Sequence, residues 1–190
     1  MALFLEQDIR ARYQKECKTR CFSATEALNE SCKFQDSKSQ FDIFLSHSSK
    51  DQELVLGLSY ILQDFGYSVY VDWSDLSLDP NNVTPQTADI LRKRMAQCNS
   101  LIYAFSENAS NSKWMPWELG YFDALKHRVA VLPISKTAKS AFKGSEFVGL
   151  YYHIQIARIK GGGSDAIWVH DGEKYVNFKY WLDNKKPYQH

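Results

Sequence analysis

The sequence predicts a doubly wound α/β fold, and two observations carry that prediction. From Phe41 onward, short apolar runs alternate with segments whose apolar residues recur at helical spacing. The run at residues 129–134 is almost wholly apolar, which is typical of a strand buried on both faces. Strands that alternate with helices form right-handed βαβ units, so we expect a parallel sheet with helices on both sides.

Five strands are expected, at residues 41–45, 67–71, 100–105, 129–134 and 151–156. The helix after the first strand should end at Gly66, which supplies the left-handed position that commonly closes a helix. The next helix should begin at Thr84, an N-cap followed by Pro85. Its inward face is marked by Ala88, Leu91 and Met95. The third helix covers residues 114–125, and the crossover through 135–150 is less regular.

Two segments flank this main domain, which we place at residues 39–160. Residues 1–38 are expected to form a helical appendage of two short helices. The first covers residues 3–18, with Leu5, Ile9 and Tyr13 on one face, and the second begins with a capping box at 23–26. The polar residues 35–40 are typical of a linker. Residues 161–190 begin with three glycines and should form a hairpin that turns at Asp171-Gly172 and packs on the main domain.

Composition limits the function. Hydrophobic residues make up 44% of the chain, enough apolar surface to offset the entropy of ordering it. The formal net charge is +1 and the basic residues are dispersed, so a nucleic-acid partner is not expected. The first residues are too short for a signal peptide, and no run of about 18 apolar residues occurs. We expect a cytoplasmic protein without a membrane partner.

The cysteines do not predict a metal site. Cys17, Cys21 and Cys32 lie in the N-terminal segment, Cys98 lies at a helix end, and none of the five histidines is near the first three. A structural zinc site needs four ligands, so we expect no metal and reduced thiols. Cys98 is not expected to act as a nucleophile, and no serine, histidine and acid pattern for a covalent hydrolase is evident.

In an open parallel sheet, ligands bind beyond the carboxyl ends of the strands, so the loops after residues 45, 71 and 105 are the candidate sites. The hydroxyls, amides and Lys50 of segment 46–50 suit a pyrophosphate group, although Ser48 or Ser49 alone would explain a helix cap equally well. Neither GxGxxG nor GxxxxGK[ST] occurs, which argues against a redox Rossmann site and a phosphate-loop NTPase. His47 is the histidine expected to face the site, although a packing role would suit it too.

Three segments together resemble the TIR domain family: FDIFLSHSSKD at 41–51, VYVDW at 69–73 and WMPWELG at 114–120. The resemblance spans about residues 41–157. It implies a flavodoxin-like five-stranded parallel sheet, a functional loop after the second strand and, in enzymatic members, a glutamate early in the third helix that drives cleavage of NAD⁺. Glu118 occupies that place. The bacterial members that this chain resembles in function are the antiviral TIR proteins of Thoeris-like systems, which make a nucleotide signal for a separate effector protein.

Cleavage of the nicotinamide–ribose bond develops positive charge on the ribose, which an ionised Glu118 would stabilise. The helix dipole should keep that carboxylate charged. Trp114 lies four residues earlier on the same helix face and could stack on the nicotinamide or adenine ring. The alternatives are a solvated helix-terminal glutamate and a tryptophan that belongs to the core.

The other expected substrate-binding residues are Phe44, Ser46, His47, Lys50, Asp72 and Trp73. NAD⁺ is expected as substrate, with no resident cofactor. The loop beyond Trp73 either gates the pocket or, as in TIR assemblies, mediates self-association, or it simply packs. It contains Leu76, Leu78, Pro80, Asn81 and Asn82.

Two other functions remain open. The chain could be a non-enzymatic TIR adaptor that acts by self-association, or an enzyme similar to nucleoside deoxyribosyltransferases, in which a glutamate attacks deoxyribose. For NAD⁺ cleavage, the sequence leaves open whether water, an adenine nitrogen, a ribose hydroxyl or another molecule such as histidine captures the ribosyl cation.

Overall fold

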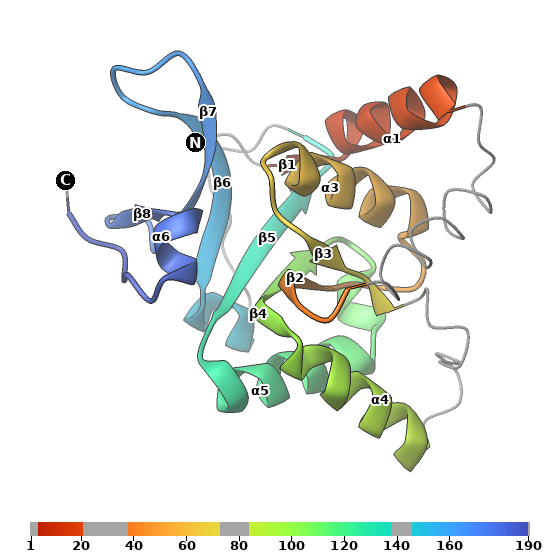
Figure 1. Ribbon diagram of the computed structural model, residues 1–190. Helices are drawn as coiled ribbons and strands as arrows, with labels where there is room; N and C mark the ends of the chain where they lie inside the picture. Colours follow the sequence, from red (N-terminus) through yellow and green to blue (C-terminus); the bar gives the residue numbers. More distant parts are fainter. Residues whose placement is uncertain (1–3, 21–37, 73–83, 138–145, 190) are drawn as a thin grey trace.

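The computed structural model describes residues 4–20, 38–72, 84–137 and 146–189. Its centre is a parallel sheet of five strands in the order β3-β2-β4-β5-β6 (Figure 1). This is the flavodoxin-like order, so the predicted fold class is confirmed. The strands are β2 (Phe41–Ser46), β3 (Val69–Tyr70), β4 (Cys98–Phe105), β5 (Val129–Ser135) and β6 (Tyr152–Arg158).

Helices cover both faces of this sheet (Figure 1). One face carries α3 (Gln52–Asp64) and α1 (Glu6–Arg20), and the other carries α4 (Pro85–Ala96) and α5 (Trp114–Lys126). Each face has its own apolar core, which explains why residues of both faces of the central strands are apolar. Two short 3₁₀ helices, η2 (Ala109–Asn111) and η3 (Glu146–Leu150), lie in the connections.

The local helix signals act as predicted. The Thr84 hydroxyl accepts a hydrogen bond from the Thr87 amide at 3.1 Å, which caps α4. Gly66 follows α3 with φ +89°, a conformation that a side chain would strain. These residues set where the helices begin and end, and thereby where the loops at the carboxyl edge of the sheet start.

The N-terminal segment is more than a helical appendage. Residues Phe4–Leu5 form a strand, β1, that pairs in parallel with Ile134 and Ser135 of β5, so the helix begins only at Glu6. Gly57 lets α1 approach α3 closely, because a Cβ there would lie 2.3 Å from the backbone oxygen of Ile9. The segment expected to form a second helix, including the capping box at 23–26, lies outside the described residues.

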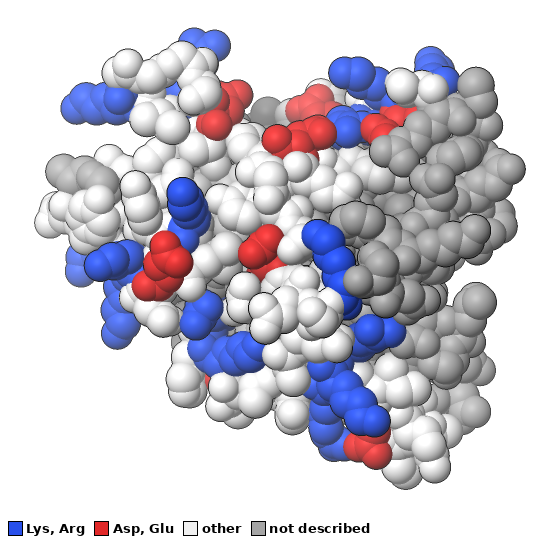
Figure 2. Space-filling model, in the orientation of Figure 1, with Lys and Arg blue, Asp and Glu red and all other residues white. Residues whose placement is uncertain are grey.

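Ion pairs join the exposed edges of α1 and α3. Arg12 contacts Asp64 at 2.7 Å, and Arg10 contacts Glu53 at 2.5 Å. Basic and acidic side chains accordingly adjoin one another in the upper right part of the surface, over these two helices (Figure 2). Surface pairs of this kind contribute little stability, so the buried side chains of Ile9 and Tyr13 hold α1 in place.

The C-terminal hairpin extends the sheet. Strand β7 (Asp165–His170) pairs antiparallel with β6, and β8 (Tyr175–Asn177) pairs antiparallel with β7. The hairpin was predicted, but its turn lies one residue later, at Gly172 and Glu173, because the Asp171 amide donates to the carbonyl of Lys174. The short helix α6 (Phe178–Leu182) was not predicted; it buries Phe178 and Trp181.

Among the described helices, none is both long enough and apolar enough to cross a lipid bilayer.

Candidate active site

The carboxyl edge of the sheet brings together Ser46, the last residue of β2, and Glu118 of α5. The Ser46 hydroxyl donates a hydrogen bond of 2.6 Å to Oε2 of Glu118. Glu118 is only 1% exposed, and its Oε1 has no hydrogen-bond partner among the described residues. One carboxyl oxygen is therefore held by Ser46, while the other is buried without a hydrogen-bond donor from the described part of the chain.

The environment of Glu118 raises its pKa to about 8. Burial is the main cause, the negative charge of Asp72 adds to it, and the hydrogen bond from Ser46 opposes both. The sequence led us to expect an ionised carboxylate favoured by the helix dipole, and the structure corrects this. Glu118 lies in the second turn of α5, where the dipole is weak, and desolvation outweighs it, so the buried position favours the protonated carboxyl group.

His47 lies between the end of β2 and Asp72. Its Nδ1 is 2.9 Å from the carbonyl oxygen of Leu45, and its Nε2 is 3.5 Å from Oδ1 of Asp72. The imidazole and the carboxylate form an ion pair only when the ring carries its second proton. His47 and Asp72 thus form a polar group directly beside the Ser46–Glu118 contact.

Tyr103 belongs to the same cluster, although sequence reasoning missed it. It lies on β4 in register with Ser46 and is buried. Burial and, to a lesser extent, the negative charge of Glu118 raise the pKa of Tyr103 to about 12. Tyr103 therefore remains a neutral hydroxyl near the carboxyl group. The register between the first and third predicted strands could have identified it.

A second polar cluster was also missed. The Asp51 carboxylate, immediately before α3, accepts hydrogen bonds from the Ser106 hydroxyl at 2.5 Å and from the Asn108 side-chain amide at 2.6 Å. Asp51 and Ser106 are both buried. The rule that functional loops follow the carboxyl ends of strands pointed to both loops, but not to these residues.

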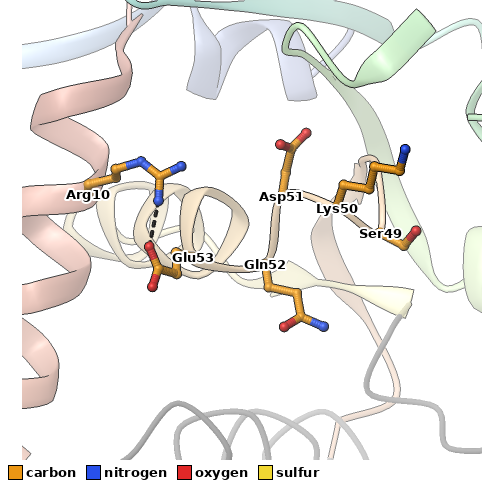
Figure 3. A pocket seen from close by; sticks show the side chains of 6 residues that line it. All are labelled: Arg10, Ser49, Lys50, Asp51, Gln52 and Glu53. Atoms are coloured by element: carbon orange, nitrogen blue, oxygen red, sulfur yellow. Dashed lines mark hydrogen bonds and ion pairs between the residues drawn. The ribbon is translucent and has the colours of Figure 1, made fainter. Parts of the chain in front are cut away.

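Lys50 lies apart from Glu118. It is exposed and lines an open cavity of about 440 Å³ together with Arg10, Ser49, Asp51, Gln52 and Glu53 (Figure 3). In this cavity Arg10 reaches from α1 to Glu53, while Lys50 lies beyond Asp51 on the other side. Glu118 does not line this cavity, so the basic residues here do not surround the carboxyl group.

Two other residues expected to bind substrate, Phe44 and Trp114, pack against aromatic side chains. Phe44 is fully buried in the core of the α4–α5 face, where its ring stacks on Tyr70 with the centroids 5.4 Å apart, so in this structure it packs the sheet. Trp114 begins α5 and is half-buried, with its ring 5.4 Å from that of Trp117. Trp73 and the loop residues Leu76, Leu78, Pro80, Asn81 and Asn82 lie outside the described residues.

The thiol chemistry of Cys98 is suppressed by burial, which raises its pKa to about 12. Its thiol donates to the carbonyl of Arg94 at 3.3 Å. Cys98 and Cys17 are both free cysteines, while Cys21 and Cys32 lie outside the described residues. Cys98 therefore has the properties of a core residue.

The fold and the site together define a class: a flavodoxin-like domain whose third main helix carries a buried glutamate to the carboxyl edge of the sheet. The model of the TIR domain family matches residues 43–159, more than half of the chain, so this protein belongs to the TIR domain family. The family resemblance of the three sequence motifs is thereby confirmed.

Two relatives extend this assignment. One relative is the probable 3′ cyclic ADP-D-ribose synthase ThsB′ of Bacillus cereus (strain MSX-D12), to which the chain is 43% identical over 190 residues. The match covers 96% of this chain and 98% of the relative. The chain is 28% identical over 104 residues, 54% of its own length and 27% of the relative, to the putative cyclic ADP-D-ribose synthase TIR2 of Cytobacillus dafuensis. The first similarity includes the N-terminal and C-terminal segments as well as the TIR domain.

Proposed function

We propose that this protein cleaves the nicotinamide–ribose bond of NAD⁺ and converts the remainder into a cyclic ADP-ribose, with Glu118 as the catalytic carboxylate. The observation that carries the proposal is the Glu118 carboxyl group itself, held by Ser46 through one oxygen and with the other oxygen unpaired among the described residues. The similarity to ThsB′ over nearly the whole chain supports the same activity.

The reaction needs a negative charge beside the ribose. As the bond from the anomeric carbon to the pyridine nitrogen breaks, nicotinamide leaves with the bonding electrons and positive charge develops on the sugar. An ionised Glu118 stabilises that charge. A hydroxyl group of the same molecule then bonds to the anomeric carbon and releases its proton, which gives a cyclic product, nicotinamide and H⁺.

Substrate binding also favours ionisation of the Glu118 carboxyl group. Because burial raises the pKa of Glu118, the free site favours the neutral form of the carboxyl group. The positive charge of the bound nicotinamide ring favours the carboxylate and lowers its pKa. At 1% exposure, Glu118 contacts substrate only after the groups that cover it move, so binding includes an opening of the site.

The proposed product and partners are supported by the relatives and by the family resemblance. We propose the 3′ cyclic product that the name of ThsB′ gives, with a ribose hydroxyl as acceptor in preference to water or an adenine nitrogen. The signal would be read by a separate effector protein in an antiphage response of the Thoeris type. Self-association through TIR surfaces is part of the proposal.

The test is incubation of the purified full-length protein with NAD⁺, measurement of nicotinamide release, and mass spectrometry of the product. Glu118→Gln should abolish release. Glu107→Gln should not, because Glu107 is a surface residue paired with Lys136. Absence of turnover by the assembled wild-type protein would favour the adaptor function. Exchange of bases between deoxynucleosides without turnover of NAD⁺ would favour a function like that of nucleoside deoxyribosyltransferases.

A further inference from the structure

We propose that Asp51 is a positioning residue that clamps the loop after β2 to the loop after β4 and so holds Ser46 against Glu118. The proposal rests on the proposed function, because it concerns the same carboxyl group. Asp51 itself lies outside the contact that it is inferred to control.

The contacts of Asp51 cross between two loops. Its Oδ2 accepts from the hydroxyl of Ser106 and its Oδ1 from the side-chain amide of Asn108, at 2.5 and 2.6 Å. Asp51 is 5% exposed, so these bonds are formed away from bulk water. Hydrogen bonds to a charged, buried acceptor are the stronger kind, and losing one leaves a costly unpaired group.

Helix capping does not account for this carboxylate. Asp51 occupies the N-cap position of α3, where an aspartate side chain normally accepts from an amide of the first turn. Its side chain forms no such bond. Both oxygens are instead directed to the loop after β4.

The two clamped loops adjoin the elements that carry the two partners of the Ser46–Glu118 contact, β2 and α5. The Asp51 backbone amide donates to the carbonyl of Ser48 at 3.0 Å, which closes a turn in the short loop that follows Ser46. In the loop after β4, the backbone amide of Asn108 donates to the Ser106 hydroxyl at 3.1 Å. The chain then continues through η2 into α5, which carries Glu118. The clamp thus ties the hydrogen-bond donor to the segment that leads to its acceptor.

A small displacement of either loop would break this contact. The Ser46–Glu118 bond is 2.6 Å long, and a hydroxyl that retreats by roughly 1 Å no longer forms it. Misplacement of a catalytic group on that scale is enough to cost up to about a hundredfold in rate. The expected signature of a loosened clamp is a fall in kcat with little change in KM.

The test uses a reversal of the Asp51–Asn108 contact. Asn108→Asp places a second carboxylate against Asp51 and should lower kcat for NAD⁺ by about tenfold or more. The double variant Asp51→Asn/Asn108→Asp restores an amide facing a carboxylate, with the roles exchanged, and should return kcat to within about twofold of the wild type. Asp42→Asn is the matched control. Asp42 accepts from Ser68 at the opposite end of β2, so its loss should lower stability without lowering kcat.

Hydrogen exchange of residues 46–51 is measured on the same proteins without NAD⁺. Exchange should accelerate in Asn108→Asp and return to the wild-type rate in the double variant. The clamp would be overturned if folded Asn108→Asp showed unchanged kcat and unchanged exchange, or if only its KM rose. It would also be overturned if kcat of the double variant were as low as that of the single variant. If the wild type does not cleave NAD⁺, the proposed function fails, and the exchange data still decide whether Asp51 holds the loop.

Discussion

Replacing Glu118 by glutamine should make the protein more stable at alkaline pH, even as it removes the carboxylate that we propose to be catalytic. A buried carboxyl group with a raised pKa favours the folded state while it is protonated and disfavours it once it ionises. The stability contributed by this proton is fully present below the unfolded pKa of 4.5 and is lost as the pH rises through the folded pKa of about 8. Glutamine does not titrate, so the Glu118→Gln variant does not lose this stability as the pH rises.

The size of the effect follows from the pKa shift. Each unit of pKa corresponds to about 1.4 kcal/mol, so the shift of Glu118 sets an upper limit on the order of 5 kcal/mol. We therefore expect the stability of Glu118→Gln relative to wild type to increase by a few kcal/mol between pH 5 and pH 9, or about 10 °C in Tm for a chain of this size. Comparing the two pH values removes any constant cost of burying the amide.

Urea unfolding followed by tryptophan fluorescence at both pH values measures this difference. Glu107→Gln serves as the control, because the Glu107 side chain is 71% exposed and should show no pH-dependent gain. A Glu118→Gln variant whose advantage over wild type is the same at pH 5 and pH 9 would refute the reasoning. Such a result would mean that Glu118 is already ionised in the folded protein.

Three further outcomes are expected. Ser46→Ala removes the hydrogen bond that lowers the pKa of Glu118, so the rising limb of kcat/KM against pH should move to higher pH, as a pH-rate profile will show. Gly57→Ala places a methyl group against the backbone of Ile9 and should destabilise the protein by about 1–3 kcal/mol or more, with faster hydrogen exchange in α1. Gly120→Ala meets no atom within 4 Å in the middle of α5 and should instead raise stability by about 0.5–1 kcal/mol in the same unfolding assay.

The parallel sheet and its helices were predictable because their signals are local. Buried strands are apolar along their whole length, and Thr84 and Gly66 mark helix ends by their own chemistry. Strand β1 carries no such signal. It is two residues long, and only its pairing with Ile134 and Ser135, far along the chain, defines it. Helix α6 is also short, at five residues, and it depends on burying Phe178 and Trp181.

The grouping of residues at the candidate site was predictable, but the pKa of its glutamate was not. Ser46, Asp72 and Glu118 could be grouped because they lie at one edge of a parallel sheet. The sequence does not reveal that Glu118 is buried, and burial decides its pKa. Phe44 shows a related limit: in a strand with both faces covered, an apolar residue near the carboxyl end looks the same whether it meets substrate or core.

The pairing of β1 with β5 has a consequence for synthesis on the ribosome. Strand β1 leaves the ribosome well before its partner β5, because Phe4 pairs with Ile134. Throughout translation of the intervening chain, the N-terminal strand has no edge to join. Strand β1 therefore reaches its final place only after β5 has been synthesised.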